Sequence, residues 1–270
     1  MEYSNLWNLV NYRSDIPYMI NSYIREYDLS KANISSLYHF KVISDKEYHE
    51  FLSMPKRDRE IKIGLMIKEN GDIYEYIKEG ILFAKKELVK ANKIYDSEII
   101  SIKNDAMFIH GRNLPITDFG VFKFVVKNTF KTYLNLGSIE VYYTDYDNNG
   151  SIESSITIKG ISDANLQLHS DGMLSIINQI CFMIDRYTIA DVLTYLMGVY
   201  VEFRNRRLPM NYYRTFDSNS KYIIQSQYMA YFIDYASNDI IGNADLTVND
   251  AIFRELISIV FDIYHSRYKK

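Results

Sequence analysis

Two aspartates stand where acidic side chains could carry out phosphoryl transfer. Asp28 closes the strand-like run "SYIREYD", and Asp105 lies much further along the chain, in "SIKNDAMFI". If their strands are neighbours, the backbones lie about 4.8 Å apart, and both carboxylates can reach the same divalent ions. Two-metal sites hold ions roughly 3.5 to 4 Å apart through hard oxygen ligands. Asp28 and Asp105 are therefore candidates for binding two Mg²⁺ ions, or Mn²⁺, and for catalysis of phosphoryl transfer.

Each aspartate also has an ordinary structural interpretation. An Asp ahead of a helix often serves as a cap or turn residue, and Asn104-Asp105 suits the tip of a hairpin. For each residue taken alone, the structural role and the metal-binding role both stay open. The two-ion hypothesis requires that the two acids meet in space.

The elements that must position the acids can be read from the period of the apolar residues. Residues 22–28 alternate with period two, so Ile24, Glu26 and Asp28 share one face of a predicted strand. Ser30 is predicted to cap the helix that follows. One side of that helix carries Ile34, Leu37 and Tyr38.

Helices and then a hairpin are predicted between the two acids. Residues 45–69 read as two short helices separated at Pro55, and a longer helix follows Asn70-Gly71. Its apolar residues recur at helical spacing, which favours packing against a sheet. Strands are predicted on both sides of Asn104-Asp105, which forms a two-residue turn.

Strands dominate the middle of the chain, and helices dominate its end. The predicted strands cover 120–128, 130–136, 138–146 and 151–161, with "DNNG" at 147–150 as a hairpin turn, and the predicted helices cover 171–186, 188–206 and 246–267. This segregation predicts an α+β fold, with an antiparallel sheet and packed helices followed by a mostly helical C-terminal third.

The acidic stretches resemble the palm domain of template-dependent DNA polymerases, most closely family B. That family has one aspartate in a strand–turn–helix motif and another on a hairpin tip, and "YDLSKANISSLY" and "IISIKNDAMFI" look like these motifs. Two further stretches follow in the family's order, "KNTFKTYLNL" at 127–136 and "ITIKGISD" at 156–163.

The resemblance covers roughly residues 20 to 165 and implies a palm-like domain over 1–165. It also implies a thumb-like or docking region over 166–270. The residues that it implies for nucleic-acid binding are Lys127, Lys131, Tyr133 and Lys159. The alternative for these lysines is an ordinary solvated strand face.

The sequence departs from the family in two places. The hairpin reads "NDAM", without the second acid that family B carries, and no stretch matches the family helix "KxxxNSxYG". The nearest substitute is "PKRDREIKIG", in which Lys56, Arg59 and Lys62 could present donors to a nucleotide triphosphate. The same charges also fit an exposed helix face.

Composition narrows the classes of protein. Among the 270 residues, 31 Lys and Arg stand against 34 Asp and Glu, and the net charge of −3 gives no overall basic field for nucleic acid. Cys181 is the single cysteine, so no internal disulfide forms. Neither a signal peptide nor a membrane-spanning run is recognisable, which predicts a cytoplasmic protein without a membrane partner.

Three functions remain as hypotheses. The first is a palm-type nucleotidyltransferase, similar to DNA polymerase, that uses two Mg²⁺ ions, nucleotides and a primer-template. The second is a catalytically inactive, palm-derived nucleic-acid-binding or assembly subunit of a phage or viral complex. The third is a structural virion or scaffold protein, whose 25 tyrosines would anchor interfaces. The abundance of Tyr, Ile, Asn and Lys suits an AT-rich genome, such as that of a phage, a virus or a low-GC bacterium, and other replication or virion proteins are expected partners.

Overall fold

The computed structural model describes residues 10–13, 15–137, 139–160, 171–209, 212 and 243–268. The chain forms an α+β protein with two antiparallel sheets, as the sequence predicts. It divides into two compact units, Met1–Arg13 with Ser22–Thr129, and Ser14–Asn21 with Phe130–Lys270. The predicted domain boundary at 165 lies outside the described residues.

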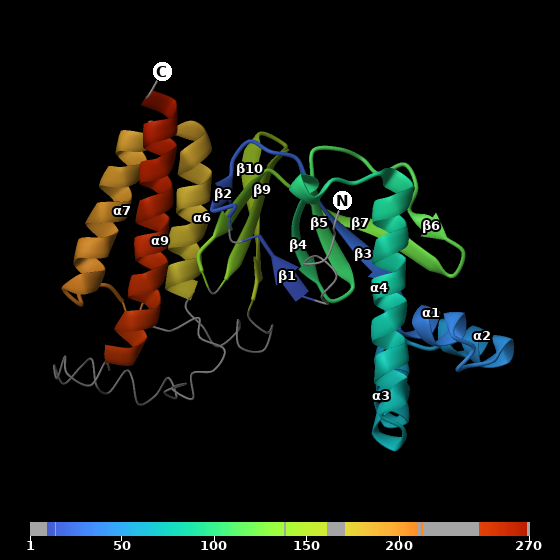
Figure 1. Ribbon diagram of the computed structural model, residues 1–270. Helices are drawn as coiled ribbons and strands as arrows, with labels where there is room; N and C mark the ends of the chain where they lie inside the picture. The colour runs from blue at the N-terminus through green and yellow to red at the C-terminus, as the bar shows by residue number, and fades with distance from the viewer. Residues whose placement is uncertain are drawn as a thin grey trace. The chain divides into compact units, whose positions relative to one another are not determined.

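A six-stranded sheet forms the base of the first unit, with the order β1-β4-β5-β3-β7-β6 (Figure 1). The Asn104-Asp105 turn joins β4 to β5 as expected, and Asn104 takes a left-handed conformation with φ 45°. The strands are β1 (Val10–Tyr12), β3 (Ile24–Ser30), β4 (Ile99–Lys103), β5 (Ala106–His110), β6 (Asp118–Phe119) and β7 (Phe122–Phe130).

The helices of the first unit lie between β3 and β4 in the sequence. They are α1 (Ala32–His39), α2 (Asp45–Ser53), α3 (Lys56–Glu69) and α4 (Asp72–Asn92), followed by the 3₁₀ turn η1 (Asp96–Glu98). The predicted break at Pro55 is confirmed, because Pro55 is the N-cap of α3.

The prediction that Ser30 caps α1 is wrong. Ser30 is still the last residue of β3, so the chain turns one residue later, at Lys31. Lys31 takes a left-handed conformation (φ 55°, ψ 37°), and no side chain forms a cap hydrogen bond there. The first turn of α1 therefore keeps N–H groups without a side-chain cap.

The core of the first unit lies between one face of the sheet and α1 and α4. Alternate residues of β3, Tyr27 and Leu29, point into this core, while Glu26 and Asp28 belong to the opposite face. Apolar side chains complete the core from β5, α1 and α4: Met107, Ile109, Ile34, Leu37, Ile77, Ile81, Ala84 and Leu88. The apolar residues of α4 recur at helical spacing because they form the one side of the helix that is buried in this core.

The second unit has a four-stranded sheet in the order β10-β9-β8-β2 and helices beside it (Figure 1). Asn149 and Gly150 both have positive φ, 54° and 85°, and form the predicted hairpin turn. The strands are β2 (Tyr18–Met19), β8 (Thr132–Asn135), β9 (Glu140–Asn148) and β10 (Ser151–Lys159), and the helices are α6 (Asp171–Arg186), α7 (Ile189–Arg204) and α9 (Asn243–Tyr268).

Candidate active site

Asp28 and Asp105 lie on adjacent segments of the first sheet. β3 pairs antiparallel with β5, and Asp28 is the partner of Ala106 in this register. The pairing continues one residue further, because the Leu29 N–H donates to the Asp105 carbonyl oxygen at 2.8 Å. The two acids are thus one residue apart in register at the same end of two adjacent strands. By strand alternation Asp105 shares the core face with Leu29, whereas Asp28 lies on the opposite face, so binding of shared ions would require the two side chains to meet around the strand ends.

Asp28 is partly exposed and lies beside a lysine of β7. The Lys127 ammonium is 3.9 Å from the Asp28 carboxylate, of which 28% is exposed. Glu26, two residues earlier on the same face, is buried and accepts a hydrogen bond of 2.5 Å from the Asn128 side chain. Asn128 therefore holds one carboxylate of this face in place, while Asp28 remains open to solvent.

Asp105 lines a pocket of about 130 Å³. The first turn of α1 forms one wall through residues 31–34, and α3 forms another through Lys56, Arg59, Glu60 and Ile63. Lys56 and Arg59, two of the three predicted nucleotide-binding residues, thus share a pocket with a predicted catalytic acid. Lys62 does not line it; its ammonium is 2.8 Å from Glu50 and lies over the ring of Phe51.

The electrostatics of this pocket favour an anion. Lys31, Lys56 and Arg59 contribute positive charge against Glu60 and Asp105, and Lys56 lies 3.6 Å from Glu60. The first turn of α1 contains no acidic residue and has no side-chain cap, so its N–H groups and helix dipole add positive potential. Phosphate groups bind well where helix N-termini and arginine donors converge.

A buried lysine lies close to Asp105. Lys85, on α4, is fully buried, and burial lowers its pKa to about 8, although the nearby Asp105 carboxylate acts in the opposite direction. The sequence itself carries a signal for this residue. Lys85 stands between Ala84 and Leu88 on the apolar stripe of α4, where a charge needs a partner.

This buried charge predicts a pH-dependent stability. Below about pH 8 Lys85 is protonated in both folded and unfolded chains, whereas between pH 8 and 10.5 the unfolded chain binds more protons. Stability should therefore rise with pH, by about 2 kcal/mol from pH 7.5 to 9.5. Urea denaturation at both pH values should show this gain in the free energy of unfolding for the wild type. The Lys85→Met variant should not show it. An equal gain in the variant would contradict the assignment.

The two aspartates have the ligand chemistry that Mg²⁺ prefers. Mg²⁺ is commonly held by one or two carboxylates, with water and substrate phosphates completing the octahedron, and Asp28 and Asp105 would supply both carboxylates if their side chains met at the strand ends. Among the described residues, no group of three or more His, Cys, Asp or Glu side chains gathers to bind a metal. Substrate oxygens would have to complete the coordination.

The remaining predicted nucleic-acid ligands belong to the second unit. Lys131 pairs with Asp145 and with Asp185, 3.2 Å from the latter. Tyr133 is fully buried and donates a hydrogen bond of 3.3 Å to Glu140, so its ring is closed to bases in this conformation. The third residue, Lys159, faces Glu140 across the β9–β10 pair. Their binding roles stay predictions.

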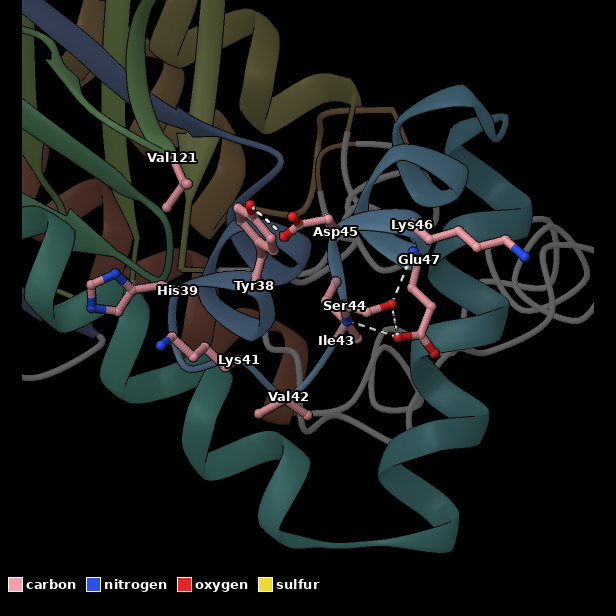
Figure 2. A pocket seen from close by; sticks show the side chains of 10 residues that line it. All are labelled: Tyr38, His39, Lys41, Val42, Ile43, Ser44, Asp45, Lys46, Glu47 and Val121. Carbon is pink, nitrogen blue, oxygen red and sulfur yellow. Dashed lines mark hydrogen bonds between the residues drawn. The ribbon is translucent and has the colours of Figure 1, made fainter.

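A larger hollow of about 900 Å³ opens near α1 and α2 (Figure 2). Four of its polar side chains bind one another in pairs. Tyr38 points to Asp45 and donates to its carboxylate at 2.8 Å, and Glu47 folds back onto Ser44 in a capping box (Figure 2). The Asp105 pocket is the stronger candidate because its three basic side chains include an arginine and lie beside a predicted catalytic acid.

Comparison with known families gives a match over most of the chain. Residues 1–262 match a family model described as "Bacteriophage PBS1 gene 130 protein". Among curated proteins none matches the sequence. In the described part of the chain, no helix has the length and apolar character that a membrane crossing needs.

Proposed function

The chain belongs to the bacteriophage PBS1 gene 130 protein family, and we propose that this phage protein is a palm-type nucleotidyltransferase. The observation that carries the proposal is the pairing of β3 with β5, which brings Asp28 and Asp105 to the same end of adjacent strands, where Asp105 lines a basic pocket. The expected substrates are nucleotides and a primer-template, in the host cytoplasm, alongside other replication or virion proteins.

The pocket supports binding of a nucleotide triphosphate. Arg59 offers a planar set of donors that matches phosphate oxygens, and Lys56 adds a second cation from the same wall. The first turn of α1 lines the same pocket through residues 31–34 and has no side-chain cap, so its N–H groups can contribute to phosphate binding. A triphosphate held there would place its inner phosphates next to Asp105.

The acids would position the reacting groups. Asp28 and Asp105 would hold Mg²⁺. The bound ions would lower the pKa of a primer 3′-hydroxyl and neutralise charge on the departing pyrophosphate. Lys127, 3.9 Å from Asp28, would contribute a cation to the primer phosphate nearest that acid. Positioning and charge neutralisation then account for most of the rate enhancement.

One contact favours the second hypothesis, an inactive palm-derived binding or assembly subunit. Lys127 already gives Asp28 a positive neighbour, and the hairpin carries one acid rather than two. Such a protein would retain the basic pocket and bind nucleotide or nucleic acid without extending a primer.

Replacement of the pocket cations tests the nucleotide site. In a primer-extension assay with Mg²⁺ or Mn²⁺, Arg59→Ala should lower kcat/KM for the nucleotide about 30-fold, the effect of about 2 kcal/mol from a charged hydrogen bond. Lys56→Ala should lower it less, because Lys56 is more exposed. Arg57→Ala, an exposed position on the same helix outside the pocket, is the matched control.

The outcomes separate the hypotheses. Extension that depends on Arg59 but not on Arg57 supports the enzyme. Nucleotide binding without extension supports the inactive subunit. If the wild type neither extends a primer nor binds nucleotide, both hypotheses are refuted.

A further inference from the structure

The outer strand of the second sheet differs from the other terminal strands. Among the described residues, the other strands that end a sheet are β1, β6 and β2, with three, two and two residues, whereas β10 has nine. A long edge presents a row of N–H and C=O groups that can pair with another strand, and proteins usually keep such edges short. β10 is therefore the edge at which strand addition is easiest.

β10 also has few of the features that block strand addition. Its pairing with β9 is continuous from Ser151–Asn148 to Lys159–Glu140, without a bulge, and its sequence "SIESSITIK" contains no proline. Residues 151–155 are exposed, and Ile152 exposes 53% of its surface. A partner that covers an exposed isoleucine would remove apolar surface from water, which contributes favourable free energy to binding.

The hairpin turn decides which backbone groups point outward. A two-residue turn at Asn149-Gly150 closes on a hydrogen-bonded pair, Asn148 and Ser151, and such pairs alternate along an antiparallel ladder. The odd-numbered residues of β10 therefore bond to β9. The outward N–H and C=O groups belong to Ile152, Ser154, Ile156 and Ile158.

We propose that a second copy of this chain pairs antiparallel with β10, with the two-fold axis at Ser155. In this register Ile152 faces Ile158 of the second copy, and Ser154 faces Ile156, so all outward groups find partners. The two four-stranded sheets then join into one continuous sheet.

Side-chain chemistry favours this register. The even-numbered face brings isoleucines together across the axis, while Glu153 faces Thr157 of the second copy and lies diagonal to its Lys159. A register two residues closer to the turn would place Ser154 opposite itself and leave Ile158 opposite Gly150, with fewer paired groups. All these residues belong to the second unit, so the inference does not rest on the proposed function.

A cysteine at the axis tests the register directly. In this register the Ser155 residues of the two copies form a non-hydrogen-bonded pair. The Cα atoms of such a pair lie about 4.5 Å apart, a distance that a disulfide spans. Ser155→Cys should form a covalent dimer on mild oxidation, seen on non-reducing gels. The control Ser151→Cys should not, because its two copies lie roughly 26 Å apart in this register. The native Cys181 is buried and should not interfere.

Light scattering and sedimentation test the interface without cysteines. The wild type should show a concentration-dependent dimer, and Ile152→Lys should raise its Kd at least about tenfold. Ile61→Lys is a matched control, because Ile61 on α3 is also 53% exposed. A monomeric wild type, equal cross-linking at 151 and 155, or a dimer insensitive to Ile152→Lys would overturn the proposal.

Discussion

Replacing either Asp105 or Asp28 with asparagine should reduce primer extension on the order of a thousandfold. Asparagine keeps the size of the side chain but removes the negative charge that would hold a divalent ion, and such ions contribute several kcal/mol to transition states of phosphoryl transfer. The two variants should fail alike, because in the two-ion hypothesis both acids, at the same end of adjacent strands, hold the same ions. Single-turnover extension over a range of Mg²⁺ concentrations measures this loss.

The double variant and a surface control make this prediction specific. Because the two acids act on shared ions, Asp28→Asn with Asp105→Asn should lose little more activity than either single variant. Asp118→Asn, at an exposed position of β6, should keep wild-type activity. Fully additive losses would show that the two acids work separately, and unchanged activity in either single variant would end the two-ion hypothesis.

The sequence predicted the elements of the fold well because their patterns are local. Strand alternation before Asp28, the break at Pro55 and the "DNNG" turn each reflect the chemistry of a few neighbouring residues. Ser30 shows where this reasoning fails. Pairing of β3 with β5 extends the strand beyond the point that the local pattern suggested and moves the helix start to Lys31.

The candidate site was only partly predictable, since it depends on contacts between distant segments. Neither the pocket that joins α1, α3 and the Asp105 hairpin nor the approach of Lys85 to Asp105 follows from spacing alone. Similarly, Lys131 looks like a free cation in the sequence, but in the structure it pairs with Asp145 and Asp185. A lysine's partners depend on tertiary packing, which local pattern does not encode.

Replacing Gly80 with alanine should destabilise the first unit by about 2 to 3 kcal/mol. Gly80 of α4 packs against Ser36 of α1, and an added Cβ would lie 2.4 Å from the Cβ and Oγ of Ser36 and 2.8 Å from its Cα. Ser36 is buried and donates to the Ala32 carbonyl at 2.8 Å, so it cannot move aside cheaply. Overpacking of this kind typically costs 1–3 kcal/mol.

Gly64→Ala gives the matched comparison, because nothing lies within 4 Å of a Cβ added at that position on α3. There alanine should stabilise by about 0.5 to 1 kcal/mol through its higher helix propensity, so the two substitutions should shift the urea midpoint in opposite directions. Because α1 also lines the Asp105 pocket, Gly80→Ala should weaken nucleotide binding where Gly64→Ala does not. Equal shifts in stability would mean that α1 and α4 are not tightly packed at Ser36, and the wall of the pocket would then lack the rigid support that binding a triphosphate requires.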